Sequence, residues 1–124
     1  MKPRRKQPEQ DLQKVVAVYL TASLVKPWRW SAFPAGGGGY LRGAILNGMG
    51  LAKGWPDILL LHPDGDWHGI ELKAPKGTAT EEQIDFLEWG GGRSAVCRSL
   101  DQVEATLRAW GIPLRATTGL RSAA

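Results

Sequence analysis

Two apolar segments joined by a cluster of turn-forming residues constrain the fold of this chain more than any other feature of its sequence. Residues 55–61 form a nearly unbroken apolar run, which is typical of a strand buried on both faces at the centre of a sheet. Residues 62–66 include an Asp-Gly pair and predict a tight turn. Residues 67–73 then alternate apolar and polar side chains. We therefore expect an antiparallel hairpin that carries Glu71 and Lys73 on one face.

Further helices and strands are predicted on both sides of this hairpin. Ser/Thr-x-x-Gln patterns at 80–83 and 99–102 indicate capping boxes that open two helices. In order, we expect a helix over 8–25, a strand over 28–33, a weak helix over 41–49, the hairpin, a helix from 80, a strand over 94–98 and a helix from 99. This order predicts an α/β fold in which helices flank a mixed β-sheet of about four strands.

Apolar spacing also predicts which side chains of the helices face the core. In the first helix these are Leu12, Val16, Tyr19, Leu20 and Ser23. In the second they are Ile84, Leu87 and Trp89, and in the last Val103, Leu107 and Trp110. His62 and His68 flank the hairpin turn, and we expect both at the surface or at a sheet edge.

The length and composition indicate one ordinary globular domain. The chain has 124 residues, enough for a single hydrophobic core, and we place a basic arm at 1–7, the domain at 8–112 and a tail at 113–124. No apolar run approaches the roughly 18 residues of a membrane span, and no signal-peptide pattern is present. Cys97, the single cysteine, is expected to be a buried, inert thiol. These features predict a cytoplasmic protein.

A net charge of +4 favours a polyanionic partner such as nucleic acid or an anionic membrane surface. Four of the 16 Lys and Arg residues lie within 2–6, where an arm could neutralise phosphates; a solubilising tail explains them equally well. The glycine run at 36–39 is not followed by the Lys-Ser/Thr pair of a Walker motif, so we expect a substrate-facing loop and no small-molecule cofactor.

The hairpin also places chemically useful side chains together. A turn centred on 64–65 puts Asp57 opposite Glu71 or Leu72, close enough for the two carboxylates to ligate one ion. Opposed acids at the margin of an apolar core need a compensating cation, and Mg²⁺ suits so few oxygen ligands; Mn²⁺ would be tolerated and zinc is not expected. Lys73 could orient water, stabilise the transition state or act as a base. Taken singly, each residue also fits a solvated strand face.

The ordered motifs resemble the PD-(D/E)XK nuclease signature and, more narrowly, the VRR-NUC family. They are 9–13 in the first helix, Gly-Trp-Pro-Asp-Ile at 54–58, Ile-Glu-Leu-Lys at 70–73 and Thr-x-x-Gln at 80–83. The resemblance covers about 8–110 and implies a restriction-endonuclease-like core. It implies metal ligation by Asp57, Glu71 and the Leu72 carbonyl, and a catalytic role for Lys73.

Two further roles come from the same resemblance. Glu9 would be an accessory acid that ligates metal directly or through water, although an acid complementing the helix dipole explains it too. On a helical wheel Glu9 shares the face of Val16 and Leu20, whereas the competing Asp11 does not. Gln83 would organise the site, although a purely capping role remains open.

The resemblance implies a Mg²⁺-dependent, structure-selective DNA endonuclease of the small phage type. Such a protein would act as a homodimer on branched DNA such as four-way junctions, in a bacterial or phage-infected cell. The alternatives are a flap or single-strand nuclease in repair or packaging, and a non-catalytic nucleic-acid-binding module. Candidate DNA contacts are Arg4, Arg5, Lys6, Arg42, Lys53 and Lys76.

Overall fold

The predicted hairpin lies at the centre of a four-stranded sheet. The computed structural model describes residues 8–33, 48–50 and 52–115. The strands are β1 (Arg29–Ala32), β2 (Ile58–Leu61), β3 (Trp67–Leu72) and β4 (Ser94–Cys97), in the spatial order β1-β2-β3-β4. β1 to β3 pair antiparallel, whereas β3 and β4 pair parallel, so the predicted mixed sheet is confirmed.

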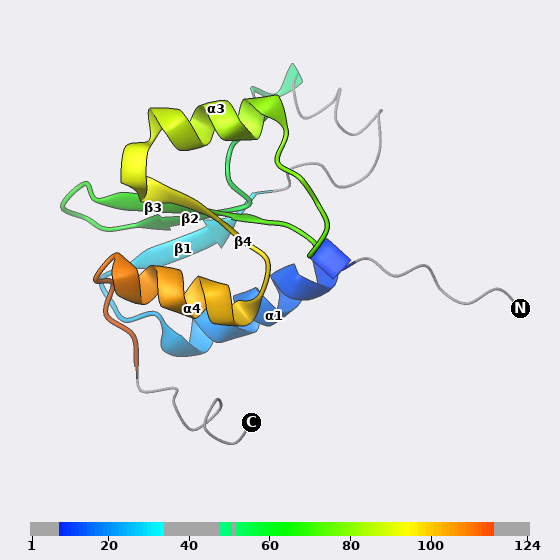
Figure 1. Cartoon of the computed structure of the whole chain (residues 1–124). Helices are drawn as coiled ribbons and strands as arrows, with labels where there is room; N and C mark the ends of the chain where they lie inside the picture. The colour runs from blue at the N-terminus through cyan, green and yellow to red at the C-terminus, as the bar shows by residue number, and fades with distance from the viewer. Residues whose placement is uncertain (1–7, 34–47, 51, 116–124) are drawn as a thin grey trace, which may run out of the picture.

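Helices cover both faces of the sheet (Figure 1). Helices α1 (Pro8–Ser23) and α4 (Leu100–Ala109) lie side by side on one face. Helix α3 (Glu81–Trp89) lies on the opposite face, and the short 3₁₀ helix η1 (Gly91–Arg93) connects it to β4. The helical crossover allows β4 to pair parallel to β3. The fold is therefore an α/β fold with three layers.

The main core lies between the sheet and the layer of α1 and α4. The inward-facing residues of β2, β3 and β4, together with the apolar faces of the two helices, are almost fully buried: Val16, Leu20, Ile58, Leu60, Ile70, Leu72, Cys97, Val103 and Leu107. The predicted inner faces of both helices are confirmed, with Leu12 and Trp110 partly buried at the margins. Each fully buried aliphatic side chain contributes roughly 1.5–3 kcal/mol to folding.

The prediction for the inner face of α3 is partly wrong. Ile84 is 45% exposed and Trp89 74% exposed, so neither belongs to the core. The side that meets the sheet carries Gln83, Phe86 and Leu87, all partly buried. Phe86 determines this orientation because its ring packs against Trp67, at 6.0 Å between ring centroids.

The surface prediction for His68 is also wrong. Its register partner is Leu60, so its side chain points toward the main core, and it is only 7% exposed. The imidazole stacks on the Trp110 ring with centroids 4.2 Å apart. Burial lowers the pKa of His68, with Asp66 opposing the shift. His62 keeps a partly exposed position beside the turn.

The packed chain extends past the predicted C-terminal boundary of the domain at residue 112. Leu114 forms a β-bridge with Leu24, and the Arg115 N–H donates to the Ser23 carbonyl at 2.8 Å, so the packed chain continues through Arg115 beyond 112. The basic arm, the glycine run and most of the predicted helix at 41–49 lie outside the described residues. Across 8–33, 48–50 and 52–115, no helix is both long and apolar enough to cross a membrane.

Candidate active site

The hairpin register brings Asp57 and Glu71 face to face. Ile58 pairs with Ile70, so the preceding Asp57 lies opposite Glu71. The Phe33 N–H donates to the Asp57 carbonyl at 2.8 Å, which continues the ladder between β1 and β2 to this position. The Leu72 N–H donates to Asp57 Oδ2 at 2.7 Å and fixes the carboxylate beside the end of β3.

Glu71 is buried in this arrangement and has an unusual proton affinity. Its side chain is hydrogen-bonded to Asp57, and the residue is only 5% exposed. Burial, followed by the hydrogen bond and the charge of Asp57, raises the pKa of Glu71 to about 9. The charge of Lys73 lowers the pKa, and the charge of Glu9 makes the smallest contribution among the causes that raise it. Because the two carboxylates lie next to each other, either a proton on one of them or a nearby cation must offset their repulsion.

Lys73 occupies the same sheet face as Glu71, as its spacing predicts. The residue is buried, and its N–H donates to the Cys97 carbonyl at 3.1 Å, which continues the parallel ladder beyond β3. The ammonium group favours the charged form of Glu71. The structure therefore brings together all three residues of the predicted constellation.

Glu9 lies at the border of the site. Its side chain is exposed in the first turn of α1, and its charge acts on Glu71. A methyl group built on Gly77 would lie 3.4 Å from Glu9 Oε1, so the side chain is next to the loop that follows Lys73. This position fits an accessory role through water better than direct ligation beside Glu71.

Gln83 forms the predicted capping box of α3. Its backbone N–H donates to Thr80 Oγ1 at 3.2 Å, and its side-chain oxygen accepts from the Thr80 N–H at 2.8 Å. The capping hydrogen bond at the start of α3 therefore explains the position of the Gln83 side-chain oxygen. In α4, Ser99 caps the helix as predicted, whereas Gln102 accepts from the Arg98 N–H at 2.6 Å, one residue before the expected partner.

Arg98 is a site neighbour that the sequence analysis missed. Its guanidinium donates to the carbonyl of Ala74 at 2.9 Å and to that of Gly77. These bonds hold the loop that begins directly after Lys73. Its position follows from the strand arrangement. Arg98 comes directly after β4, and because β3 and β4 are parallel, the residues that follow them lie at the same edge of the sheet.

An aromatic cluster beneath α3 was also missed. Trp55, two residues before Asp57, packs against Phe86 with ring centroids 5.4 Å apart. Phe86 in turn contacts Trp89 at 5.5 Å. Trp67 stacks with Trp89 at 6.0 Å and completes the cluster. Alternation in the sequence could not reveal it because its members come from three separate segments.

The candidate DNA contacts are only partly described. Arg4, Arg5, Lys6 and Arg42 lie outside the described residues. Lys76 is exposed in the loop after Lys73. Lys53 is exposed too, but it lines a pocket together with acidic residues of α3.

Asp57 and Glu71 offer oxygen donors of the kind that hard divalent ions prefer. Within the described part of the chain, no three His, Cys, Asp or Glu side chains gather into a group that could hold a metal. The protein therefore offers the carboxylates of Asp57 and Glu71, with the Leu72 carbonyl as a predicted third oxygen. Mg²⁺ binds readily to one or two carboxylates together with water and phosphate oxygens, whereas protein zinc sites take three or four ligands.

No protein-family model, curated protein or solved structure significantly matches this chain.

Proposed function

We propose that this protein is a Mg²⁺-dependent DNA endonuclease similar to the VRR-NUC nucleases. One observation carries the proposal: Asp57 and Glu71 oppose each other across β2 and β3, with Lys73 on the same face. Burying two acidic side chains next to each other lowers the free energy of unfolding, whereas acids on a solvated strand face carry no such cost. A site that binds a divalent ion offsets this cost.

Each residue has a distinct task in this proposal. Asp57 is oriented by the Leu72 N–H, so its carboxylate is held in place before substrate binds. Glu71 provides the second carboxylate from a buried position. Bound Mg²⁺ would lower the pKa of water and polarise a phosphate oxygen. Lys73 supplies a positive charge that orients the attacking water and stabilises charge on the phosphate as the bond to the leaving oxygen breaks.

The proposed substrate is DNA, with branched structures such as four-way junctions preferred over linear duplex. The net charge of +4 supports a polyanionic substrate. The preference for branches and the action as a homodimer come from the resemblance to small VRR-NUC proteins. Mn²⁺ is proposed to replace Mg²⁺ because both bind oxygen ligands.

A cleavage assay tests the proposal. The full chain is incubated with labelled four-way junction, flap, duplex and single-stranded DNA in Mg²⁺, in Mn²⁺ and in a chelator. We expect metal-dependent cleavage of the junction that Asp57→Ala and Lys73→Ala abolish. Glu88→Gln, which removes an exposed carboxylate of α3, should cleave normally. Equal cleavage by the Asp57→Ala variant would contradict the proposal, and faster cleavage of flaps would change the substrate class.

A further inference from the structure

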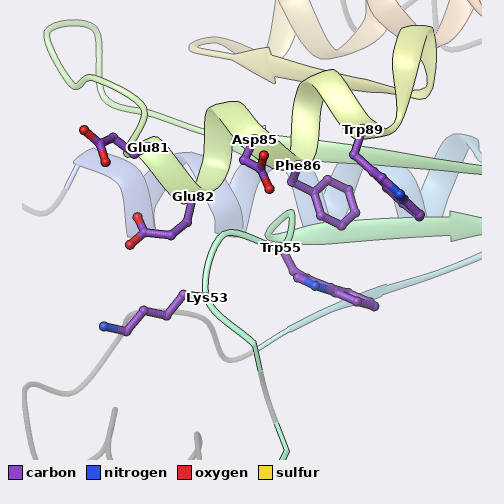
Figure 2. A pocket seen from close by; sticks show the side chains of 7 residues that line it. All are labelled: Lys53, Trp55, Glu81, Glu82, Asp85, Phe86 and Trp89. Atoms are coloured by element: carbon purple, nitrogen blue, oxygen red, sulfur yellow. The ribbon is translucent and has the colours of Figure 1, made fainter.

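A pocket of about 580 Å³ opens between α3 and the segment that leads into β2. Its lining combines two chemistries, as Figure 2 shows. Carboxylates of Glu81, Glu82 and Asp85 lie toward the start of α3, and the rings of Trp55, Phe86 and Trp89 lie toward its end. Lys53 lies on the acidic side, below Glu82. This pocket is separate from the Asp57 and Glu71 pair and plays no part in the proposed hydrolysis.

The two segments that form the pocket pack closely against each other. Gly54 has a φ of 87°, and a methyl group added there would lie 2.5 Å from the Glu82 carbonyl oxygen, so the segment presses closely against α3. The ring contacts of Phe86 with Trp55 and Trp89 hold the aromatic side. Nevertheless Trp55 remains 48% exposed and Trp89 74% exposed. Both rings are therefore accessible to a ligand.

The charged side chains that line the pocket favour a cationic ligand. Helix α3 contains Glu81, Glu82, Asp85 and Glu88 and no basic residue. Lys53 offsets one of the three carboxylates that line the pocket. Arginine and lysine side chains match this lining, because their charged ends pair with carboxylates while their stems and cations pack on aromatic rings. A DNA backbone would instead be repelled, although exposed tryptophans alone would suit unpaired bases.

We propose that this pocket binds the basic arm of the same chain, residues 2–6. The arm carries Lys2, Arg4, Arg5 and Lys6 and no acid, which complements the acidic helix. Seven residues precede α1, and an extended chain of that length spans up to about 24 Å.

The arm can reach the pocket from its starting point. Glu9 lies beside Gly77, as the 3.4 Å separation between Glu9 Oε1 and a built methyl group shows. Gly77 is four residues before Glu81, so at most about 14 Å of chain separates this contact from the acidic end of the pocket. The length of the arm exceeds that separation. The start of α1 and the acidic end of the pocket therefore lie at the same end of the described structure.

Zero-length carbodiimide cross-linking of the full chain tests this proposal without reference to catalysis. The carbodiimide activates a carboxylate, and a neighbouring lysine amine then forms an amide with it while the carbodiimide leaves as its urea, so only side chains in direct contact are joined. We expect cross-links from Lys2 or Lys6 to Glu81, Glu82 or Asp85, identified by mass spectrometry. Glu88 is an exposed acid on the same helix outside the pocket lining and provides the internal control. Equal cross-linking to Glu88 would overturn the proposal.

A mixture of ¹⁴N- and ¹⁵N-labelled chains identifies the source of the arm. Cross-links within single chains, independent of dilution, are the expected result. Cross-links found only between differently labelled chains would assign the pocket to a second copy and overturn the same-chain proposal.

The indole N–H signals of Trp55 and Trp89 give a second measurement. Arg4→Ser/Arg5→Ser and Glu82→Gln/Asp85→Asn should shift both signals, whereas Glu88→Gln should leave them in place. Unchanged signals in the arm variant would overturn the proposal. So would shifts that appear only when a single-stranded oligonucleotide is added, because they would show a base-stacking surface.

Discussion

Asp57 and Glu71 lie opposite each other on neighbouring strands, and their side chains are hydrogen-bonded. The Leu72 N–H holds one oxygen of Asp57 at 2.7 Å, so the carboxylate cannot turn away from its neighbour. A pair of acids restrained in this way is unfavourable when both are charged. Repulsion between the two carboxylates therefore lowers the stability of the folded hairpin. A change of pH, a bound metal or a substitution should alter this repulsion, and unfolding experiments can measure the effect.

The stability of the metal-free protein should depend on pH through Glu71. The folded protein holds the pKa of this group at about 9, whereas an ordinary glutamate has 4.5. Folding then favours the protonated form, so its contribution is complete below pH 4.5 and is lost as the pH rises toward 9. The free energy of unfolding should therefore fall as the pH rises through this range. Urea unfolding at several pH values in a chelator measures it.

Glu71→Gln is the control for this pH dependence because it removes the titrating group while keeping the shape. The variant should show a flatter profile and should be more stable than the unmodified protein near pH 8. Parallel profiles for the two proteins would show that Glu71 does not titrate in this way.

Divalent metal should stabilise the protein at neutral pH. Mg²⁺ or Mn²⁺ at about 100 times its dissociation constant should raise the free energy of unfolding by about 2.7 kcal/mol. Asp57→Asn should reduce this gain because only one of the two carboxylates remains to bind the metal. Asp11→Asn, which changes an exposed acid of α1, should retain it. Thermal unfolding with and without metal makes the comparison, and an equal gain in both variants would exclude Asp57 as a ligand.

Lys73 should be needed for hydrolysis and not for metal binding. Lys73→Met keeps much of the buried stem and removes the charge, so cleavage should fall by about 10²–10³-fold. Stabilisation by Mn²⁺ should persist or increase because a neighbouring cation is lost. Single-turnover cleavage rates and thermal unfolding separate the two effects. Cleavage at the original rate would remove Lys73 from the mechanism.

Gly54 should be essential for seating α3. An alanine there would combine a φ of 87° with a methyl group 2.5 Å from the Glu82 carbonyl oxygen. We expect a loss of at least about 1–3 kcal/mol in the free energy of unfolding. Gly111→Ala is the matched control, since its φ is 75° and nothing lies within 4 Å of the added group. Equal losses in the two variants would show that only the backbone angle matters.

The hairpin could be predicted because its local signals agree. An apolar run, an Asp-Gly turn and an alternating strand predict the register to within one residue, with Asp57 opposite Glu71 or Leu72, and the structure places it opposite Glu71. The same alternation puts Lys73 on that face. The sequence alone therefore predicts that Asp57, Glu71 and Lys73 lie together, without any knowledge of distant contacts.

The misplaced residues depend on contacts between distant segments. Ile84 has the spacing of a core residue, but the Phe86 ring packs against Trp67 and turns Ile84 outward. His68 is polar by type, yet Trp110 from α4 provides a stacking partner in the core. Neither partner is near in sequence. Periodicity within one element cannot identify them.

Cleavage of a labelled four-way junction by the unmodified protein and by Glu71→Gln tests directly whether the paired carboxylates support metal-dependent hydrolysis. Both are measured in Mg²⁺ and in a chelator, after unfolding experiments confirm that the variant folds. We expect Mg²⁺-dependent cleavage by the unmodified protein and a loss of at least about 10²-fold in the variant. Cleavage that persists in the chelator, or that the variant carries out at the original rate, would contradict this expectation.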